Sequence, residues 1–464
     1  MAQIKIKKGL DIPIKGHPTD GVRALIPGGE VSPLDEPASI ALDLKGFEDI
    51  KFRLLVKAGD VVKIGQPLAE DKSTPGRMFV SPAAGVVSEV RRGAKRALQD
   101  IVIEVARHGE TYQEFPPIDP LKVGKQEIID RLMTAGLFAK IRSRPFNLLA
   151  DPAKAPRSIF VKAIESAPFV PPAELQVKGF EHEFQVGLNA LSKLTDGPVH
   201  LVYAKDSTFH AFTEAQNVQK HTAEGPHPIA THSLHIQQID PIRSADAVVW
   251  TLNAHDVVSI GYLLSKGKYF INRVISIAGP GILPDRLGYF KAREGYPVSP
   301  LVAGRIRKGL MRLISGDPLM GKKVAPEDFL GFDHYAFCVV PENTKREFLH
   351  FFGLGLNKYS FSKAYISGHL DNSNREYNFT TNQHGEHRAF VDATLYDQVM
   401  PLHINTMLLV KAVLAEDFEL AELYGILEVD SEDFALPTFV CPSKMEMTDI
   451  IKTGMKQYAK ELLS

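Results

Sequence analysis

The feature that most constrains the fold of this chain is a run of short apolar segments, separated by tight-turn signals, between residues 56 and 93. Glycine and proline recur there at close intervals, at Gly59, Gly65, Pro75 and Gly85. Strands of about two to five residues that are joined by such turns favour hairpins over helices. The segment therefore predicts a small β-sandwich near the N-terminus.

One lysine in this segment suggests a specific chemistry. Lys72 follows Glu70 and Asp71, and a Glu-Asp-Lys run near a hairpin tip resembles the lipoyl and biotinyl carrier fold, whose lysine is covalently modified. The stretch from Lys72 to the closing Gly85 is longer than in a carrier hairpin, because residues 73–76 add a proline-bearing loop. Two interpretations stay open, a modified carrier lysine and a solvated residue of a structural hairpin, and the loop length favours the second.

Length and composition indicate a multidomain globular protein. The chain has 464 residues, 44% hydrophobic and 23% charged, and we expect about three or four domains. Lysine plus arginine (54) nearly cancels aspartate plus glutamate (55), so no overall field favours nucleic acid or a membrane surface. The sequence contains no signal-peptide pattern and no apolar run of ~18 residues, and two cysteines suit a reducing compartment.

After a proline-rich linker at residues 110–120, the chain alternates between strand and helix patterns. Strands are expected at residues 158–164, 199–203, 247–252 and 273–278, and helices at residues 126–135, 180–194 and 255–265. Strands and helices that alternate at this spacing favour a mainly parallel, doubly wound sheet. Trp250, the only tryptophan, lies on one of the expected buried strands.

The rest of the chain predicts a small mixed α+β module and a helical end. Residues 311–315 and 334–340 have strand character. Residues 402–423 carry apolar residues on most faces and predict one buried helix, which ends at Gly425. Residues 447–463 predict an amphipathic helix with Thr448 as its N-cap.

Two glycine-containing loops come close to nucleotide-binding motifs. The loop from Gly316 to Lys323 follows a strand and nearly matches a phosphate-binding loop, but Lys323 replaces the magnesium-binding hydroxyl and Pro326 opposes a following helix. The other loop begins Gly279-Pro280-Gly281 but lacks the third glycine of a dinucleotide fingerprint. We interpret the second loop as a strand-ending turn.

Histidines and cysteines give no complete metal site. His227, His232 and His235 cluster without an acidic companion in a proline-bearing loop, so hydrogen-bonded loop histidines are favoured over a zinc site. Cys441 precedes a proline, as the last ligand of an iron–sulfur run does, but the earlier ligand positions hold no cysteine. Cys338 lies on an apolar strand and predicts core packing.

A basic turn is the remaining candidate for a contact surface. Residues 91–96 place four positive charges around Gly93. A solvated hairpin is one interpretation, and a contact for an acidic protein surface or a lipid headgroup is the other.

Many longer segments, in one order, resemble the A subunit of the bacterial sodium-translocating NADH:quinone oxidoreductase (Na⁺-NQR). The matching segments are residues 6–14, 70–72, 81–85, 92–96, 142–146, 225–228, 314–316, 357–360, 379–382, 399–402 and 438–442. Ser443 and residues 383–385 depart from the family pattern without touching a residue of known chemical role. The chain is therefore identified as a member of that family.

The resemblance implies an α/β multidomain fold. The expected parts are a lipoyl/biotinyl-like barrel-sandwich at 1–108, a Rossmann-like α/β domain at 109–283, a β-grasp (SLBB-like) module at 284–340 and a mainly helical C-terminal domain at 341–464. The resemblance also implies a peripheral location on the cytoplasmic face of the bacterial inner membrane, as part of a membrane complex. The complex would oxidise NADH, reduce ubiquinone and export Na⁺.

The resemblance assigns the redox groups to the other subunits of the complex. NADH, FAD and a 2Fe-2S centre would belong to one of them, and FMN and riboflavin to the membrane-embedded ones, among which the B subunit is the main contact. This chain is then expected to be quinone-proximal and structural, with no cofactor, catalytic residue or metal of its own, and inactive in isolation. The alternative is a stand-alone lipoyl/biotinyl-type carrier or transferase that uses Lys72, and a nucleotide-binding enzyme is a third possibility.

Overall fold

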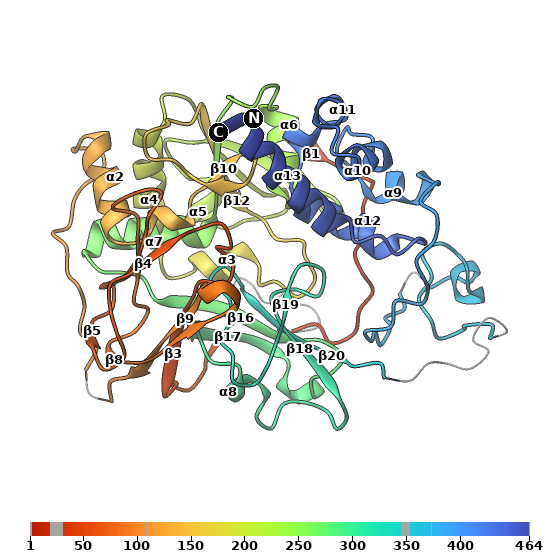
Figure 1. Cartoon of the computed structure of the whole chain (residues 1–464), viewed down its shortest axis with the longest axis horizontal. Coiled ribbons are helices and arrows are strands. Elements are labelled where there is room, and N and C mark those ends of the chain that lie inside the picture. Colours follow the sequence, from red (N-terminus) through yellow and green to blue (C-terminus); the bar gives the residue numbers. More distant parts are fainter. Residues whose placement is uncertain (1, 19–30, 108, 345–352, 373, 464) are drawn as a thin grey trace.

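The computed structural model describes residues 2–18, 31–107, 109–344, 353–372 and 374–463 (Figure 1). Its strands form four sheets, and the helices after residue 393 gather at one end of the α/β sheet. Within these residues, no helix is both long enough and apolar enough to cross a membrane.

The N-terminal β-sandwich is built from two antiparallel sheets. One has the order β3-β9-β8-β5 and the other β4-β6-β7. Their bounds are β3 (Ser39–Asp43), β4 (Phe52–Leu54), β5 (Val61–Val62), β6 (Pro67–Asp71), β7 (Met78–Val80), β8 (Gly85–Arg92) and β9 (Leu98–Val105). The core between them includes the buried side chains of Ile40, Leu68, Phe79 and Ile103. A Cβ on Gly85 would lie 1.9 Å from the Glu104 carbonyl oxygen, so this crossing requires glycine.

The α/β sheet has seven strands in the order β1-β14-β13-β12-β15-β10-β11. Its strands are β1 (Gln3–Lys5), β10 (Arg142–Arg144), β11 (Leu148–Leu149), β12 (Ser158–Ala163), β13 (Val199–Ala204), β14 (Gln219–Glu224) and β15 (Val249–Asn253). The strands β1, β14, β13, β12 and β15 are parallel to their neighbours, whereas β10 and β11 run antiparallel. The chain order therefore reverses between β12 and β15, which is the switch point of a Rossmann-like sheet.

Both faces of this sheet are covered. On β12, Ile159 and Val161 belong to the core beneath α4 (Glu181–Leu194) and α7 (Ala254–Lys266). Phe160, between them, belongs to the core shared with α6 (His232–Ile239) and the C-terminal helices. Alternating side chains therefore bury the strand on both sides, as expected for a parallel sheet. The remaining helices here are α2 (Lys125–Thr134), α3 (Ala173–Val177) and α5 (His210–Thr213).

A six-stranded sheet forms the third part, with the order β19-β18-β20-β16-β17-β2. Its strands are β2 (Ser32–Pro33), β16 (Asn272–Ala278), β17 (Gly288–Arg293), β18 (Met311–Ser315), β19 (Lys322–Val324) and β20 (Ala336–Pro341), and α8 (Ser299–Val302) lies beside them. The predicted strand at 273–278 is thus real, but its placement in the doubly wound sheet is wrong. It pairs antiparallel with β17 and parallel with β20 instead.

Two N-terminal segments also cross between the predicted parts. β1 pairs with β14 in the α/β sheet, and β2 pairs with β17 in the six-stranded sheet. The predicted range 1–108 therefore contains more than the sandwich. An edge strand can be supplied by any segment that reaches the edge, because pairing depends on backbone groups rather than on sequence proximity.

The C-terminal part contains α9 (Thr394–Val399), α10 (Thr406–Leu414), α11 (Phe418–Leu423), α12 (Ala435–Val440) and α13 (Met447–Leu463). The single helix predicted at 402–423 is wrong. Glu416 adopts φ 54°, and the Asp417 carboxylate accepts the Leu420 N–H, which starts a new helix. The predicted cap Thr448 lies inside α13, whose first N–H, from Met447, is accepted by the Thr438 hydroxyl at 3.1 Å.

Candidate functional site

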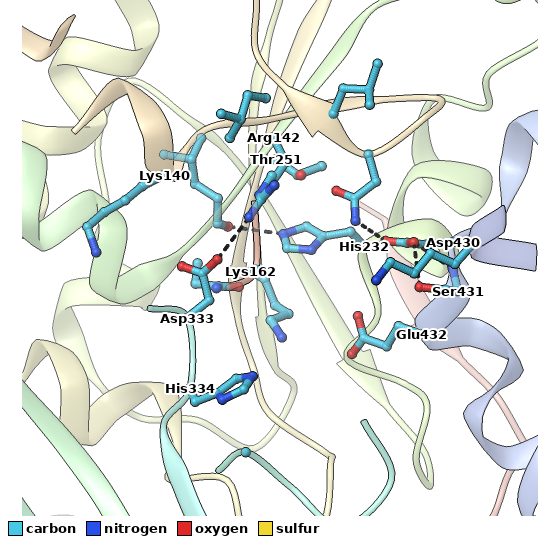
Figure 2. A pocket seen from close by; sticks show the side chains of 18 of the residues that line it. Lys140, Arg142, Lys162, His232, Thr251, Asp333, His334, Asp430, Ser431 and Glu432 are labelled. Atoms are coloured by element: carbon cyan, nitrogen blue, oxygen red, sulfur yellow. Dashed lines mark hydrogen bonds and ion pairs between the residues drawn. The ribbon is translucent and has the colours of Figure 1, made fainter. Parts of the chain in front are cut away.

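A cleft of about 430 Å³ lies at the switch point of the α/β sheet (Figure 2). Lys162 near the end of β12 and Asn253 at the end of β15 line it, which places it at the carboxyl ends of the parallel strands. Residues of the sandwich loop 46–50, of the six-stranded sheet and of the C-terminal helices complete its walls. Ligands of open α/β sheets bind at this position, so the cleft is the candidate site.

Lys162 forms the floor of the cleft. Its Nζ lies 3.1 Å from Oε1 of Glu165, a residue in the loop that follows β12. Burial disfavours the charged lysine, but the carboxylates of Glu165 and Glu432 outweigh it and raise the pKa of Lys162. The lysine is therefore a charged donor at neutral pH.

Glu432 faces this lysine from the C-terminal part of the chain. It lies on the short 3₁₀ helix Ser431–Phe434, which is fixed by a capping box between Asp430 and Asp433. Figure 2 shows its carboxylate directed into the same space as Lys162. The carboxylate makes no hydrogen bond or ion pair with any residue that the structure describes. Burial raises the pKa of Glu432 to about 7, although the charge of Lys162 acts in the opposite direction.

Arg142, at the start of β10, forms another wall. Its Nη2 lies 3.1 Å from Oδ2 of Asp333, and its guanidinium lies over the Phe47 ring at 5.3 Å. Nε and Nη1 form no hydrogen bond within the described part of the chain. Arg144, two residues further along the chain, has a structural role instead, because it donates a hydrogen bond to the Val429 carbonyl and lies 3.8 Å from Asp430.

Two histidines of the cleft are neutral at pH 7. His232 Nε2 donates to the Leu252 carbonyl at 3.1 Å, and burial holds the pKa of His232 well below its usual value. His334 Nδ1 lies 2.8 Å from the Ser315 hydroxyl, and burial lowers the pKa of His334 to about 4. Both rings therefore act as hydrogen-bonding groups rather than as cations.

The predicted carrier lysine lies elsewhere. Lys72 is exposed in the loop between β6 and β7 and does not line the cleft. The neighbouring carboxylates are structural. Asp71 is fully buried, with its Oδ2 2.9 Å from Nη1 of Arg77, and Glu70 accepts the Gly76 N–H at 2.8 Å. The Glu-Asp-Lys run thus fixes a hairpin, which favours the unmodified interpretation.

Neither glycine loop is built for a phosphate. The Gly316 loop leads into strand β19, and the Asp317 carboxylate accepts the N–H groups of Leu319 and Met320 from within the loop. At the other loop, the Gly279 N–H donates to the Gly16 carbonyl, and a Cβ on Gly279 would lie 2.5 Å from the Val339 carbonyl oxygen. This glycine serves a strand-ending turn, as predicted.

The histidine cluster is dispersed into separate hydrogen bonds. His227 bonds the Ser166 hydroxyl, His232 the Leu252 carbonyl and His235 the Ile229 carbonyl. Among the residues with a described position, no group of three or more histidine, cysteine or acidic side chains could hold a metal ion. Cys338 and Cys441 are both buried, and the Cys441 sulfur lies 3.1 Å from the Tyr396 hydroxyl.

The basic turn makes internal contacts. Arg91 pairs with Glu89 at 2.9 Å and donates to the Glu327 carbonyl, and Arg92 donates to the Arg96 carbonyl. The 3₁₀ turn Ala94–Arg96 that follows has Lys95 and Arg96 at positive φ. A structural hairpin accounts for these contacts, and a role in partner binding stays a prediction.

Sequence reasoning singled out two residues that line the cleft, His232 and Gly316, within incomplete motifs, but it did not identify Arg142, Lys162 or Glu432 as site residues. Arg142 occurs in one of the family-matching segments, but nothing in that segment indicates a binding role. Lys162 interrupts an apolar strand and is the one local signal that was available, because a charged residue in a buried strand needs a partner. In the sequence, Glu432 is one of several acidic residues at a helix start, so its local context does not indicate a binding role.

Comparisons of the sequence with family models and with named relatives identify the same family along the chain. Family models match residues 4–106 as the NqrA N-terminal barrel-sandwich hybrid domain, residues 123–269 as the NqrA second alpha/beta domain and residues 274–325 as the NQRA C-terminal domain. A Chlamydia caviae protein, named as the A subunit of Na(+)-translocating NADH-quinone reductase, is 36% identical over 99% of this chain and 97% of its own length. The chain belongs to this family, NqrA.

Other members of the NqrA family are equally similar. A Saccharophagus degradans protein with the same name is 35% identical over 99% of this chain and all of its own length. The predicted barrel-sandwich, Rossmann-like α/β and SLBB parts are thereby confirmed. Among solved structures, an NAD⁺-reducing [NiFe]-hydrogenase chain aligns at 14% identity over 49% of each chain with a TM-score of 0.35, which is too low to support an argument.

Proposed function

We propose that this chain is the peripheral, cytoplasmic-side A subunit of a complex that couples NADH-driven ubiquinone reduction to Na⁺ export. The observation that carries the proposal is the end-to-end similarity, at 36% identity, to a protein that is named as the A subunit of such a reductase. Similarity that covers all parts of the chain supports a shared role of the whole protein, whereas similarity in one domain alone would not.

Within the complex, the chain has a structural and quinone-proximal role next to the membrane-embedded B subunit. NADH, FAD, FMN, riboflavin and the 2Fe-2S centre reside in the other subunits. The loop after β12 supports the absence of a flavin or dinucleotide site in this chain. Residues 164–172 contain three prolines and no glycine, and α3, which follows, has only five residues. A pyrophosphate needs a glycine turn and a helix N-terminus at this place.

A pull-down tests the assignment. The chain is tagged at its native locus, recovered from gently solubilised membranes and assayed for NADH-driven quinone reduction with and without Na⁺. We expect membrane subunits to be recovered together with Na⁺-stimulated activity. Recovery of the chain alone from the soluble fraction contradicts the proposal.

A second measurement tests the cofactor assignment. The purified chain is expected to show no flavin absorbance and no NADH oxidation. A flavin spectrum with a stoichiometry near one per chain contradicts this part of the proposal and leaves the membership of the complex intact.

A further inference from the structure

The switch-point cleft presents two charged groups whose hydrogen-bonding capacity is not filled within the described part of the chain. The Glu432 carboxylate has no hydrogen-bonding partner among the described residues, and only Nη2 of the Arg142 guanidinium has one. Both side chains line the cleft, Arg142 from the α/β sheet and Glu432 from the C-terminal part. Figure 2 shows Arg142 at the top of the view and Glu432 at the lower right, with Lys162 below Arg142 and to the left of Glu432.

A partly buried carboxylate without a partner carries a desolvation cost. Water that is removed from a charged oxygen must be replaced by another donor, or stability is lost. The other charged residues near Glu432 are Lys162, Glu165, Asp430 and Asp433. Lys162 is held by Glu165, Asp430 caps a helix turn, and Asp433 accepts the Asp430 N–H. These partners leave the Glu432 carboxylate as an open acceptor of the cleft, together with the buried Oδ1 of Asp256, which also lacks a hydrogen bond among the described residues.

Arg142 is the corresponding open donor. Its contact with Asp333 engages one edge of the guanidinium, and Phe47 supports one face of it. Nη2 carries two N–H groups, one beside Nε–H and one beside Nη1, so with Asp333 on one of them the other still forms a two-point fork with its neighbour, which matches the two oxygens of a carboxylate. The neutral ring of His334 and the hydroxyl-bearing Thr251 and Ser431 also line the cleft and add hydrogen-bonding groups.

We propose that the switch-point cleft binds a small zwitterion of the amino acid or dipeptide class, with its ammonium group on Glu432 and its carboxylate on Arg142. The cleft volume of about 430 Å³ accommodates a ligand of this size. An anion such as a phosphate would meet the Glu432, Glu165 and Asp317 carboxylates. A ligand that carries both charges can pair its ammonium group with Glu432 and its carboxylate with Arg142.

Ligand titration of the purified full-length chain tests the proposal. The probes are the standard amino acids and glycyl dipeptides, with ethylamine and acetate as single-charge controls. We expect at least one zwitterionic probe to raise the thermal midpoint in a saturable manner and to bind in calorimetry. Neither ethylamine nor acetate should match it. If no zwitterionic probe binds, or if ethylamine or acetate binds as tightly, the proposal is wrong.

Variants locate the site. Glu432→Gln and Arg142→Gln are each expected to weaken binding at least about tenfold, because each removes a charge-assisted hydrogen bond. Glu419→Gln, on the exposed surface of α11, is the matched control and should bind as the unmodified chain does. Binding that is unchanged in both cleft variants would place the ligand elsewhere and overturn the assignment.

Proton release provides an independent readout. An ammonium group beside Glu432 stabilises its charged form, so binding at pH 7 should expel part of a proton from a carboxyl whose pKa burial has raised to about 7. Calorimetry in buffers of different ionisation enthalpy measures this release. The release should disappear in Glu432→Gln. Release that persists in that variant contradicts the role of Glu432.

Discussion

The Nζ of Lys140 lies 3.4 Å from Oε2 of Glu294, and both side chains are almost completely buried. This ion pair joins the turn before β10 of the α/β part to the end of β17 in the six-stranded sheet. Asp256, at 4.0 Å, and the Phe332 ring, at 4.6 Å, complete the surroundings of the lysine. The pair thereby sets how two walls of the switch-point cleft meet.

Removal of one partner of this pair should be costly. Lys140→Met removes one of the two cations beside the buried Glu294 carboxylate, which keeps Arg273 at 3.7 Å, and we expect a loss of about 3 kcal/mol in the free energy of unfolding. The double variant Lys140→Met/Glu294→Gln should recover part of that loss, because the buried carboxylate that lost its lysine is replaced by a neutral amide. Urea denaturation measures both values. Equal losses in the single and double variants would contradict the role of this pair.

A glycine at the contact of α4 and α7 should be intolerant of a side chain. A Cβ on Gly261 would lie 1.7 Å from the Glu183 carbonyl oxygen of the facing helix. Gly261→Ala is expected to destabilise the chain by about 2 kcal/mol or more, because the helices must move apart. Gly46→Ala is the matched control, since nothing lies within 4 Å of a Cβ there. Thermal and chemical denaturation should separate the two variants clearly.

Buried histidines should make the chain sensitive to acid. Burial lowers the pKa of His235 to about 3, against a usual value of 6.5, and its Nε2 donates to the Ile229 carbonyl at 2.8 Å. The unfolded chain therefore binds the proton first, so this contribution is complete above pH 6.5 and is lost as the pH falls toward 3.

The variant His235→Gln should remove that pH dependence. The difference in unfolding free energy between the unmodified chain and the variant is expected to shrink by on the order of 2 kcal/mol between neutral pH and pH 4. The exposed His210, whose side chain is 84% accessible, provides the control His210→Gln. A difference that stays constant with pH would show that His235 does not titrate on unfolding.

The ion pairs between the sandwich and α13 should contribute little. Lys452 and Lys456 lie 3.1 and 3.0 Å from the Glu48 carboxylate, and all three side chains are partly exposed. Partial burial opposes ionisation, but hydrogen bonds from Lys456 and Lys452 lower the pKa of Glu48 to about 2. Lys456→Ala should cost less than about 1 kcal/mol, and less again in high salt. A large, salt-independent loss in urea denaturation would contradict this prediction.

The lysine of the sandwich hairpin should be unmodified. Lys72 is exposed, and its neighbours Asp71 and Arg77 already form a closed structural pair. The intact mass of the chain purified from its native source is expected to equal that of the bare polypeptide. Lys72→Arg should leave both stability and complex assembly unchanged. An added lipoyl or biotinyl mass that disappears in Lys72→Arg would restore the carrier hypothesis.

Local elements were largely determined by the sequence. The turn residues of the sandwich and the periodicity of α4, α7 and α13 are short-range signals, and each of these elements forms within a residue or two of its predicted bounds. The break between α10 and α11 also had a local signal, the capping residue Asp417. The strong apolar pattern of residues 402–423 concealed it, because periodicity continues across a short interruption.

The tertiary structure alone decided the pairing of strands and the composition of the cleft. β1 and β16 have ordinary strand patterns that fit more than one sheet. Strands pair through backbone groups, so the sequence of a strand does not specify its partner. Arg142, Lys162 and Glu432 lie far apart in the sequence, and among them only Lys162, a charged residue within an apolar strand, has a local context that could indicate a site. Packing of the C-terminal part against the α/β sheet brings them together in one partly buried cleft, and the loss of water there makes their charges a candidate site.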